Sequence, residues 1–209
     1  MDKIKLGVLV GGTSIEREVS KKSCENLLAN LDENKYDITV YHLPADGNTE
    51  WAKNIISNPP QIVLSALHGG NGENGSIQGF LHCLNIPYIG SKVLSSAICM
   101  NKAMAKTVMK ANHIQIPDHV FVMRGVDFSQ YEESIKLMGF PLIVKPNRGG
   151  SSIGVIVARN MEDIHYGIKN IMENYDDDVL IEKFIDGKEI NCCVLQGENG
   201  PEAMAVLDV

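Results

Sequence analysis

The strongest constraint on the fold is an apolar run at Ile4–Val10 that ends at two glycines. Such a nearly continuous run is typical of a strand of a parallel sheet that is buried on both faces. We expect a helix to follow this strand, with Thr13 or Ser14 as its N-cap. Glu16 and Glu18 would lie in the first turn of that helix, where acidic side chains suit the helix dipole.

Strands and helices continue to alternate along the first half of the chain. Further strands are expected at residues 38–43, 61–67 and 86–89, and a helix is expected to begin at Ser76. This alternation predicts the α/β fold class, with an N-terminal doubly wound parallel sheet over residues 1–96. A ligand crevice would lie at the carboxyl ends of the strands, where glycine-rich loops and His68 follow.

The second half of the chain has short strands that indicate an α+β arrangement with antiparallel pairing. Helices are expected at residues 101–112, 129–138 and from 160 onwards. Strands are expected at residues 120–123, 141–145, 155–158, 179–184, 189–195 and 203–209. Because the chain ends inside a predicted strand, whose open edge natural proteins usually protect, we expect the rest of a domain to lie beyond it.

Composition excludes several classes of protein. The 209 residues are 44% hydrophobic and 22% charged, which is close to soluble globular averages and argues against disorder, collagen and coiled coil. The formal charge of −7 and the lack of a long basic run predict no nucleic-acid partner and no membrane partner. The five cysteines follow no disulfide or metal-site spacing, and no apolar run is long enough for a secretion signal or a membrane span. We therefore expect a reduced, cytoplasmic protein.

The loop from Lys145 to Gly154, with sequence KPNRGGSSIG, has the composition of a phosphate-binding segment. Its glycines let backbone N–H groups approach a phosphate, its serines add hydroxyl donors, and Lys145 adds a positive charge. The spacing is that of neither a P-loop nor a dinucleotide fingerprint. Composition alone favours phosphate binding over a flexible hairpin turn with a solvated lysine.

Three further clusters each allow a functional and a structural interpretation. Glu182 and Lys183 could line an adenine slot, although an exposed strand end is favoured when this segment is taken alone. Glu16 could hold a substrate ammonium group, although helix capping explains it well without further context. His68, at the carboxyl end of a strand and beside several glycines, is as consistent with a functional role as with a structural one.

Taken together, the order and spacing of these motifs resemble the D-alanine–D-alanine ligases of the ATP-grasp superfamily, and the resemblance covers the whole chain. The matching stretches are Gly11–Ser20, His68–Gly79, Ile86–Gly90, Asn101-Lys102, Val144–Pro146 with Gly150–Gly154, and Leu180–Lys183 with Glu189. The resemblance implies a pre-ATP-grasp, Rossmann-like substrate domain at 1–96 and an ATP-grasp nucleotide-binding lobe at 97–184. Residues 185–209 would then begin the large ATP-grasp lobe, which is truncated here.

The resemblance also implies an activity. Members of this family use ATP and Mg²⁺ to join two D-alanines through an acyl phosphate, which supplies D-alanyl-D-alanine for peptidoglycan synthesis. D-alanine and a second copy of the chain, as a homodimer, are therefore the implied partners. Because the metal ligands of the family lie beyond Val209, we expect no metal ligand within this chain and no turnover by these residues alone.

Residue roles follow from the resemblance as well. Glu16 would hold the ammonium group of the first D-alanine near His68, and Ser151 would help to fix the substrate, so Glu16 and Ser151 are the implied catalytic residues. The implied ATP-binding residues are Lys102, Lys145, Gly150, Ser151, Ser152, Glu182, Lys183 and Glu189. The two lysines would bind phosphates, whose transfer depends mainly on positioning and charge neutralisation, and Glu189 would bind the ribose.

Two alternatives remain open. One is a ligase that places D-serine or D-lactate second, since the residues that select the second substrate lie mainly outside this chain. The other is a short non-catalytic protein that binds nucleotide or amino acid as a sensor or partner. The presence of Glu16, Lys102 and Lys145 argues against the second alternative, since a sensor would not need all three.

Overall fold

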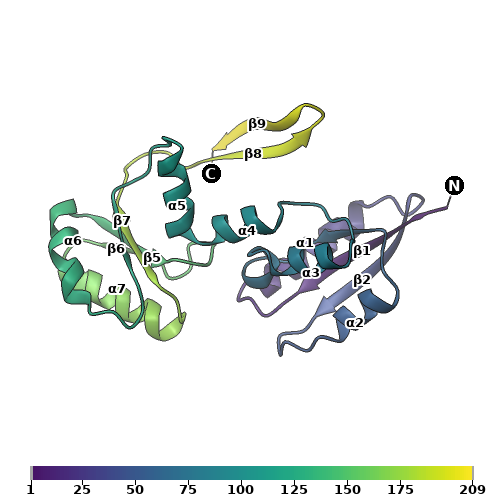
Figure 1. Cartoon of the computed structure of the whole chain (residues 1–209), viewed down its shortest axis with the longest axis horizontal. Coiled ribbons are helices and arrows are strands. Elements are labelled where there is room, and N and C mark those ends of the chain that lie inside the picture. Colours follow the sequence, from purple (N-terminus) through teal and green to yellow (C-terminus); the bar gives the residue numbers. More distant parts are fainter. Residues whose placement is uncertain (1, 209) are drawn as a thin grey trace.

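A computed structural model describes residues 2–208, which form two larger sheets with flanking helices and a separate hairpin (Figure 1). The first elements are β1 (Ile4–Gly11), α1 (Arg17–Asn30), β2 (Tyr36–Leu43), α2 (Glu50–Ser57), β3 (Ile62–Ser65), the 3₁₀ turn η1 (Gly70–Gly72), α3 (Ser76–Cys83) and α4 (Val93–Met100). The next are α5 (Lys102–Ala111), β4 (His119–Val122), the 3₁₀ turn η2 (Phe128–Tyr131), α6 (Glu132–Met138), β5 (Leu142–Pro146) and β6 (Ile156–Ala158). The last are α7 (Met161–Asn174), β7 (Val179–Lys183), β8 (Ile190–Gly197) and β9 (Gly200–Asp208).

The N-terminal sheet has the strand order β2-β1-β3, and both pairs are parallel. Side chains of the central strand β1 alternate between the two faces of the sheet. Val8 packs in a cluster with Cys24 of α1, while Leu9 packs on the opposite face with Ile55 of α2 and Leu81 of α3. Helices therefore cover both faces, which confirms the predicted doubly wound parallel sheet.

The strand expected at 86–89 is only partly right. This segment forms an isolated parallel bridge between Tyr88 and Val63 instead of a regular strand. The N–H of Val63 donates to the carbonyl of Pro87 at 2.8 Å, and the N–H of Ile89 donates to the carbonyl of Val63 at 3.0 Å. Because Pro87 has no N–H to donate, the pairing cannot extend as a full ladder there.

The start of α1 differs from the prediction. The helix begins at Arg17, and Glu16 rather than Thr13 or Ser14 occupies the N-cap position, without a capping bond from its side chain. Ser14 instead accepts the N–H of Glu16 on its hydroxyl oxygen at 3.1 Å. Glu16 therefore precedes the first turn, and Glu18 alone of the two expected acids lies in it.

Helices elsewhere also depart from the expected bounds. The helix expected at 129–138 begins as the 3₁₀ turn η2, because Asp127 accepts the N–H of Ser129 at 3.0 Å, and α6 itself begins only at Glu132. The short helices α2 and α4 were not among the expected elements. Within the described residues, no helix is long and apolar enough to cross a membrane.

The second sheet has the order β4-β7-β5-β6, with every pair antiparallel as predicted. One face buries Val144 and Ile181 against a cluster that includes Ile171 of α7. Because side chains alternate along a strand, Lys145 and Glu182 lie on the other face, toward α5. This face of the sheet carries the charged residues that the motifs singled out.

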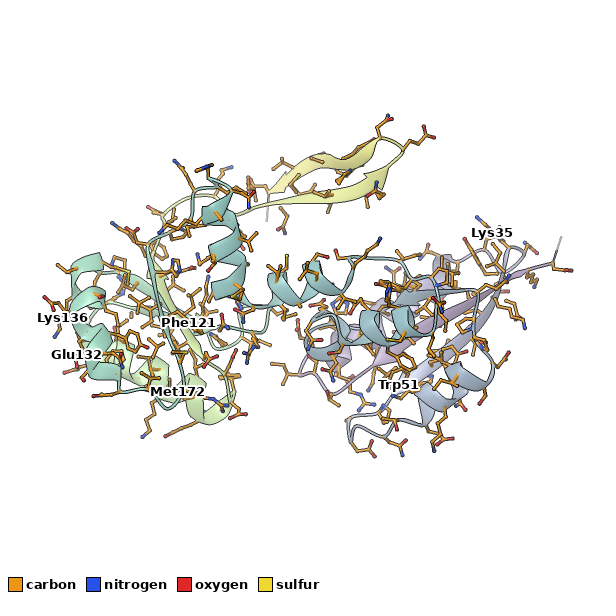
Figure 2. The ribbon with its side chains drawn as sticks, in the orientation of Figure 1. Lys35, Trp51, Phe121, Glu132, Lys136 and Met172 are labelled. Carbon is orange, nitrogen blue, oxygen red and sulfur yellow. The ribbon has the colours of Figure 1, made fainter. Side chains whose placement is uncertain are left out.

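An exposed ion pair lies on the outer side of this half, and the last two strands form a separate sheet. Figure 2 shows Glu132 and Lys136 together on the outer side of α6, where Nζ and Oε2 are 2.9 Å apart. Such an exposed pair contributes little to stability. The β8–β9 hairpin projects beyond the end of β7, with side chains such as Ile190 and Val206 largely exposed (Figure 1).

Candidate functional site

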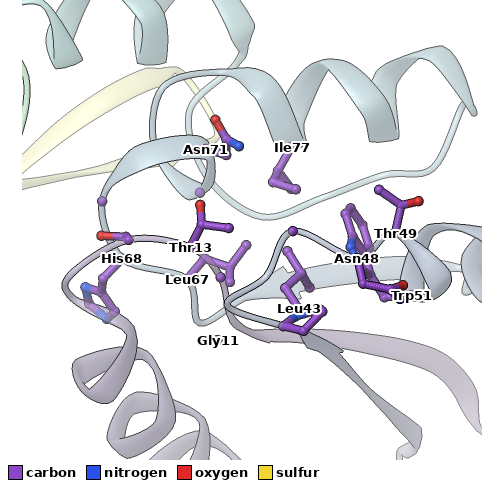
Figure 3. A pocket seen from close by; sticks show the side chains of 16 residues that line it. Gly11, Thr13, Leu43, Asn48, Thr49, Trp51, Leu67, His68, Asn71 and Ile77 are labelled. Atoms are coloured by element: carbon purple, nitrogen blue, oxygen red, sulfur yellow. The ribbon is translucent and has the colours of Figure 1, made fainter. Parts of the chain in front are cut away.

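A crevice lies at the carboxyl ends of the parallel strands, where the sequence predicted it. A cavity of about 140 Å³ is lined by Gly11 at the end of β1 and Thr13 after it, by Leu67 and His68 after β3, and by Trp51 of α2 (Figure 3). Parallel strands all end at the same edge of the sheet, so their loops converge there. The lining is mostly apolar apart from these loops.

Glu16 connects this crevice with the second half of the chain. Its Oε1 accepts a hydrogen bond from the hydroxyl of Ser151, 135 positions away in the sequence, at 2.5 Å. Its Oε2 lies against Gly69, so closely that a Cβ at Gly69 would collide with it. A Cβ at Gly150 would lie 3.9 Å from both carboxylate oxygens. The structure therefore brings Glu16, Gly150 and Ser151 together.

His68 lies in the same loop as Gly69, but its ring points toward α1 (Figure 3). Its Nε2 is 2.8 Å from the hydroxyl oxygen of Ser23, and its Nδ1 is 3.9 Å from Oε1 of Glu73. Ser23 thus fixes the orientation of the imidazole. No motif pointed to Ser23, which occupies an ordinary helical position in the sequence.

The glycine- and serine-rich loop between β5 and β6 is conformationally unusual. Ser151 and Ser152 have φ angles of 52° and 56°, between Gly149 at 107° and Gly154 at 74°. Non-glycine residues rarely adopt positive φ, and those that do are concentrated in binding loops and active sites. Successive backbone N–H groups in such turns can converge on an anion, which supports the interpretation of this loop as a phosphate site.

Lys102, at the start of α5, holds the beginning of this loop. Its Nζ donates to the carbonyls of Pro146 at 3.0 Å and Gly149 at 2.8 Å. Burial, and next the nearby charge of Lys145, lower the pKa of Lys102. Asn147 is fully buried beside it and accepts the N–H of the second α5 residue, Ala103, at 2.9 Å.

Lys145 and Glu182 form an ion pair across β5 and β7. Lys106 of α5 binds the other carboxylate oxygen of Glu182, with Nζ and Oε2 2.7 Å apart. Burial acts to raise the pKa of Glu182, but its close pairing with Lys106 and Lys145 outweighs that effect and keeps the pKa below its usual value. The motifs included Lys145 and Glu182 but missed Lys106, whose partner is far away in the sequence.

Asp177 also holds the glycine- and serine-rich loop between β5 and β6 in place. Its Oδ2 accepts the N–H of Arg148 at 2.5 Å, and its Oδ1 accepts the N–H of Asp178 at 2.8 Å. Burial raises the pKa of Asp177 in spite of these two hydrogen bonds. The run of acids before β7 gave no motif signal, yet it fixes the residue at which the glycine-rich segment begins.

Three of the predicted ATP-binding residues take no part in the side-chain hydrogen bonds and ion pairs described for Glu16, Lys102, Lys145 and Asp177. Ser152, Lys183 and Glu189 are exposed, and among residues 2–208 no side-chain hydrogen bond involves them. The backbone of Lys183 pairs with Asp118, its N–H donating to the carbonyl at 2.9 Å. Glu189 immediately precedes the projecting β8 strand.

The carboxylates of the site do not by themselves form a metal centre. Across residues 2–208, no group of three or more His, Cys, Asp and Glu side chains lies close enough together to hold a metal ion. Mg²⁺ in phosphate-transferring sites is held by one or two carboxylates together with substrate phosphates.

Comparison with known proteins identifies the relatives of this fold and site. Two family models match, one for the "D-ala D-ala ligase N-terminus" over residues 49–91 and one for the "D-ala D-ala ligase C-terminus" over residues 108–209. A crystal structure of the D-alanine–D-alanine ligase from Bacillus anthracis is 33% identical, with a TM-score of 0.79, and the match covers 99% of this chain and 71% of that one. The chain belongs to the D-alanine–D-alanine ligase family.

Other members of the D-alanine–D-alanine ligase family give the same result. A curated D-alanine–D-alanine ligase of Bacillus anthracis is 40% identical over 199 residues, which is 95% of this chain and 63% of the relative. A crystal structure of a Bacillus anthracis ligase complexed with ATP is 35% identical, with a TM-score of 0.83, over 98% of this chain and 65% of that one. The chain thus spans about 63% of the length of the curated relative. The family resemblance predicted from the motifs is confirmed.

Proposed function

We propose that this chain takes part in the ATP-dependent ligation of two D-alanines, through an acyl phosphate, to give D-alanyl-D-alanine for peptidoglycan. The observation that carries this proposal is the hydrogen bond between Ser151 and Glu16, because it joins an amino-acid crevice to a phosphate-type loop. A carboxylate and a terminal phosphate must meet in this reaction. Similarity to a ligase whose structure contains ATP supports the nucleotide assignment.

In the proposed reaction, the carboxylate of the first D-alanine attacks the terminal phosphorus of ATP, and ADP leaves. The amine of the second D-alanine then attacks the acyl carbon, and phosphate leaves. Glu16 would hold the ammonium group of the first substrate, so that the carboxylate points toward the loop of Gly150 and Ser151. Closure of this loop over the crevice would keep water from the acyl phosphate. His68 would line the same crevice.

The nucleotide would bind on the charged face of the second sheet. Lys102 and Lys145 would exchange their present partners for phosphate oxygens, with Gly150, Ser151 and Ser152 supplying N–H and hydroxyl donors. Glu182 and Lys183 would contact adenine, and Glu189 would contact the ribose. In this proposal, Mg²⁺ is supplied with the nucleotide.

The proposal also covers the domains, the assembly and the cellular location. Residues 1–96 would form the substrate domain, residues 97–184 the nucleotide-binding lobe, and residues 185–209 the start of the large ATP-grasp lobe. We propose a homodimer as the assembly and the cytoplasm as the location, where ATP and free D-alanine are both available.

The proposed function is tested by measuring the binding of D-alanine and of ATP separately in variants of the residues assigned to each ligand. We expect Glu16→Gln to weaken D-alanine binding about tenfold or more and ATP binding little, since a charged hydrogen bond is lost only to the amino acid. We expect Lys145→Ala to show the opposite pattern. Isothermal titration calorimetry with D-alanine and with ATP measures both affinities.

Glu18→Gln is the matched control, because Glu18 is an exposed acid two positions away that pairs with Lys21. We expect Glu18→Gln to leave both affinities unchanged. An equal loss of both ligands in Glu16→Gln would remove Glu16 from its role. ATP affinity at the wild-type level in Lys145→Ala would contradict the phosphate-loop assignment.

A further inference from the structure

Four charged side chains lie between α5 and the second sheet: Lys102, Lys106, Lys145 and Glu182. Lys106 has no role in the proposed function. The side chain of Lys106 is only 11% exposed, and that of its partner Glu182 is 10% exposed. A lysine so deeply placed requires a partner, because an unpaired buried charge is strongly unfavourable. The pair thus fixes both side chains.

Lys106 and Lys102 lie four residues apart, which places them on the same side of α5. Lys102 reaches the carbonyls of the glycine-rich loop, while Lys106 reaches β7 through Glu182. The first turns of α5 are therefore attached to both parts of the proposed nucleotide site. Lys110, one turn further along α5, is exposed and belongs to no ion pair within residues 2–208.

Glu182 divides its two oxygens between two lysines: Oε1 binds Lys145 and Oε2 binds Lys106. The cluster contains this carboxylate and three lysines, with Lys102, and the carboxylate of Asp177 also acts on Lys102. The three lysines outnumber the two acids, so the region as a whole attracts anions. The bond from Lys106 decreases the attraction of Glu182 for Lys145, because the carboxylate is already paired.

We propose that Lys106 is a positioning residue of the nucleotide site, which holds Glu182 on the sheet and weakens its hold on Lys145, so that Lys145 can exchange Glu182 for a nucleotide phosphate. This inference rests on the nucleotide-binding part of the proposed function. Within residues 2–208, the ion pair of Lys106 is with Glu182, so its proposed effect on the nucleotide passes through Lys145. Without Lys106, Glu182 would retain Lys145 as its single partner.

The test is a double-mutant cycle with ATP as the ligand. Lys106→Met keeps the apolar stem and removes the charge, so we expect the ATP dissociation constant to rise about tenfold. Because Lys145 would then already be lost to Glu182, adding Lys145→Ala to Lys106→Met should weaken ATP binding little further. A residue with only a structural role would give losses that add, as distant sites do.

Matched variants separate charge from packing. Lys106→Arg should restore most of the ATP affinity, while Lys106→Gln, which keeps a donor for Glu182 without the charge, should lose affinity in the direction of Lys106→Met. Lys110→Met removes a charge from the exposed part of the same helix and should leave ATP binding unchanged. Thermal unfolding of each variant shows whether it is folded, and Lys106→Gln serves for the cycle if Lys106→Met is not.

Titration of Glu182 provides a second measurement that needs no nucleotide. Its carboxylate pairs with Lys106 from α5 and Lys145 from β5, and its charge also acts on Lys102. His119 stands opposite Glu182 on β4. Carbon-13 NMR of labelled carboxyl groups should show a higher pKa for Glu182 in Lys106→Gln than in the wild type.

The outcomes distinguish this inference from the function on which it rests. ATP binding at the wild-type level in Lys106→Met, or additive losses in the cycle, would overturn the role of Lys106 and leave the proposed function intact. Failure of the wild-type chain to bind ATP would overturn both. Non-additive losses with recovery in Lys106→Arg would support the inference.

Discussion

Gly69 offers a direct test of how Glu16 is placed. Gly69 has φ 63° and ψ 176°, a region that essentially only glycine adopts. A Cβ added there would collide with Oε2 of Glu16 and lie 2.6 Å from the hydroxyl oxygen of Ser14. The neighbouring Gly70 also has a positive φ, 47°, but a Cβ there would meet only the Cβ of Ser14, at an ordinary 3.6 Å.

The two glycines therefore form a matched pair. Gly70→Ala costs backbone strain alone, about 1–2 kcal/mol. Gly69→Ala costs about 1–3 kcal/mol in backbone strain. It must also displace Glu16 from Ser151, which adds about 1 kcal/mol for a hydrogen bond at a partly exposed site. We expect Gly69→Ala to lower the free energy of unfolding by about 3 kcal/mol, roughly twice the effect of Gly70→Ala.

Urea denaturation measures the two losses of stability, and calorimetric titration with D-alanine measures the displacement of Glu16. We expect D-alanine affinity to fall in Gly69→Ala as it does in Glu16→Gln, and to stay near the wild-type value in Gly70→Ala. Equal losses of stability in the two alanine variants would refute the steric argument. Unchanged D-alanine affinity in a folded Gly69→Ala protein would refute the placement of the substrate ammonium at Glu16.

Two further predictions concern the second sheet. Glu182 has a pKa below the usual 4.5, since its close pairing with Lys106 and Lys145 outweighs the effect of burial. Its contribution to stability is therefore present above that value and is lost as the pH falls through the lower folded pKa. Glu182→Gln should therefore flatten the acid side of the stability curve measured by denaturation at several pH values, and parallel curves for the two proteins would contradict the ion pairs. Asn147→Ala leaves the N–H of Ala103 without its acceptor and should lower the free energy of unfolding, measured by urea denaturation, by about 2 kcal/mol. A decrease within about 0.5 kcal/mol, as for a typical surface change, would exclude this role of Asn147.

Elements that depend on local chemistry were predictable from the sequence. The side chains of Asn101 and Asn160 accept the N–H groups of residues three positions ahead, at 3.1 and 2.9 Å, and thus begin α5 and α7 as expected. The run at Ile4–Val10 is the central strand of its sheet, because its apolar side chains are buried on both faces. The helices α2 and α4 escaped prediction, although α3, which is also eight residues long, was expected from Ser76.

The candidate site was predictable only where a motif carried it. Glycine, serine and lysine in one segment indicated the phosphate-type loop, but the positive φ angles of Ser151 and Ser152 depend on the folded turn. The contact between Glu16 and Ser151 crosses 135 positions, so no local pattern contains it. Lys106 looks like any surface lysine of a helix, because its burial arises only when α5 packs beside Glu182.

The internal bonds of the site resemble those that its proposed ligands would form. Glu16 accepts a hydroxyl where an ammonium group is expected, Lys102 donates to the carbonyl of Gly149, and Lys145 pairs with Glu182 where phosphates are expected. Each ligand must replace one of these bonds, so its affinity reflects the difference between the new bond and the old one. Side chains that weaken the old bond therefore strengthen ligand binding without touching the ligand. Lys106 acts in this way on Lys145, since it competes for the carboxylate that Lys145 must leave.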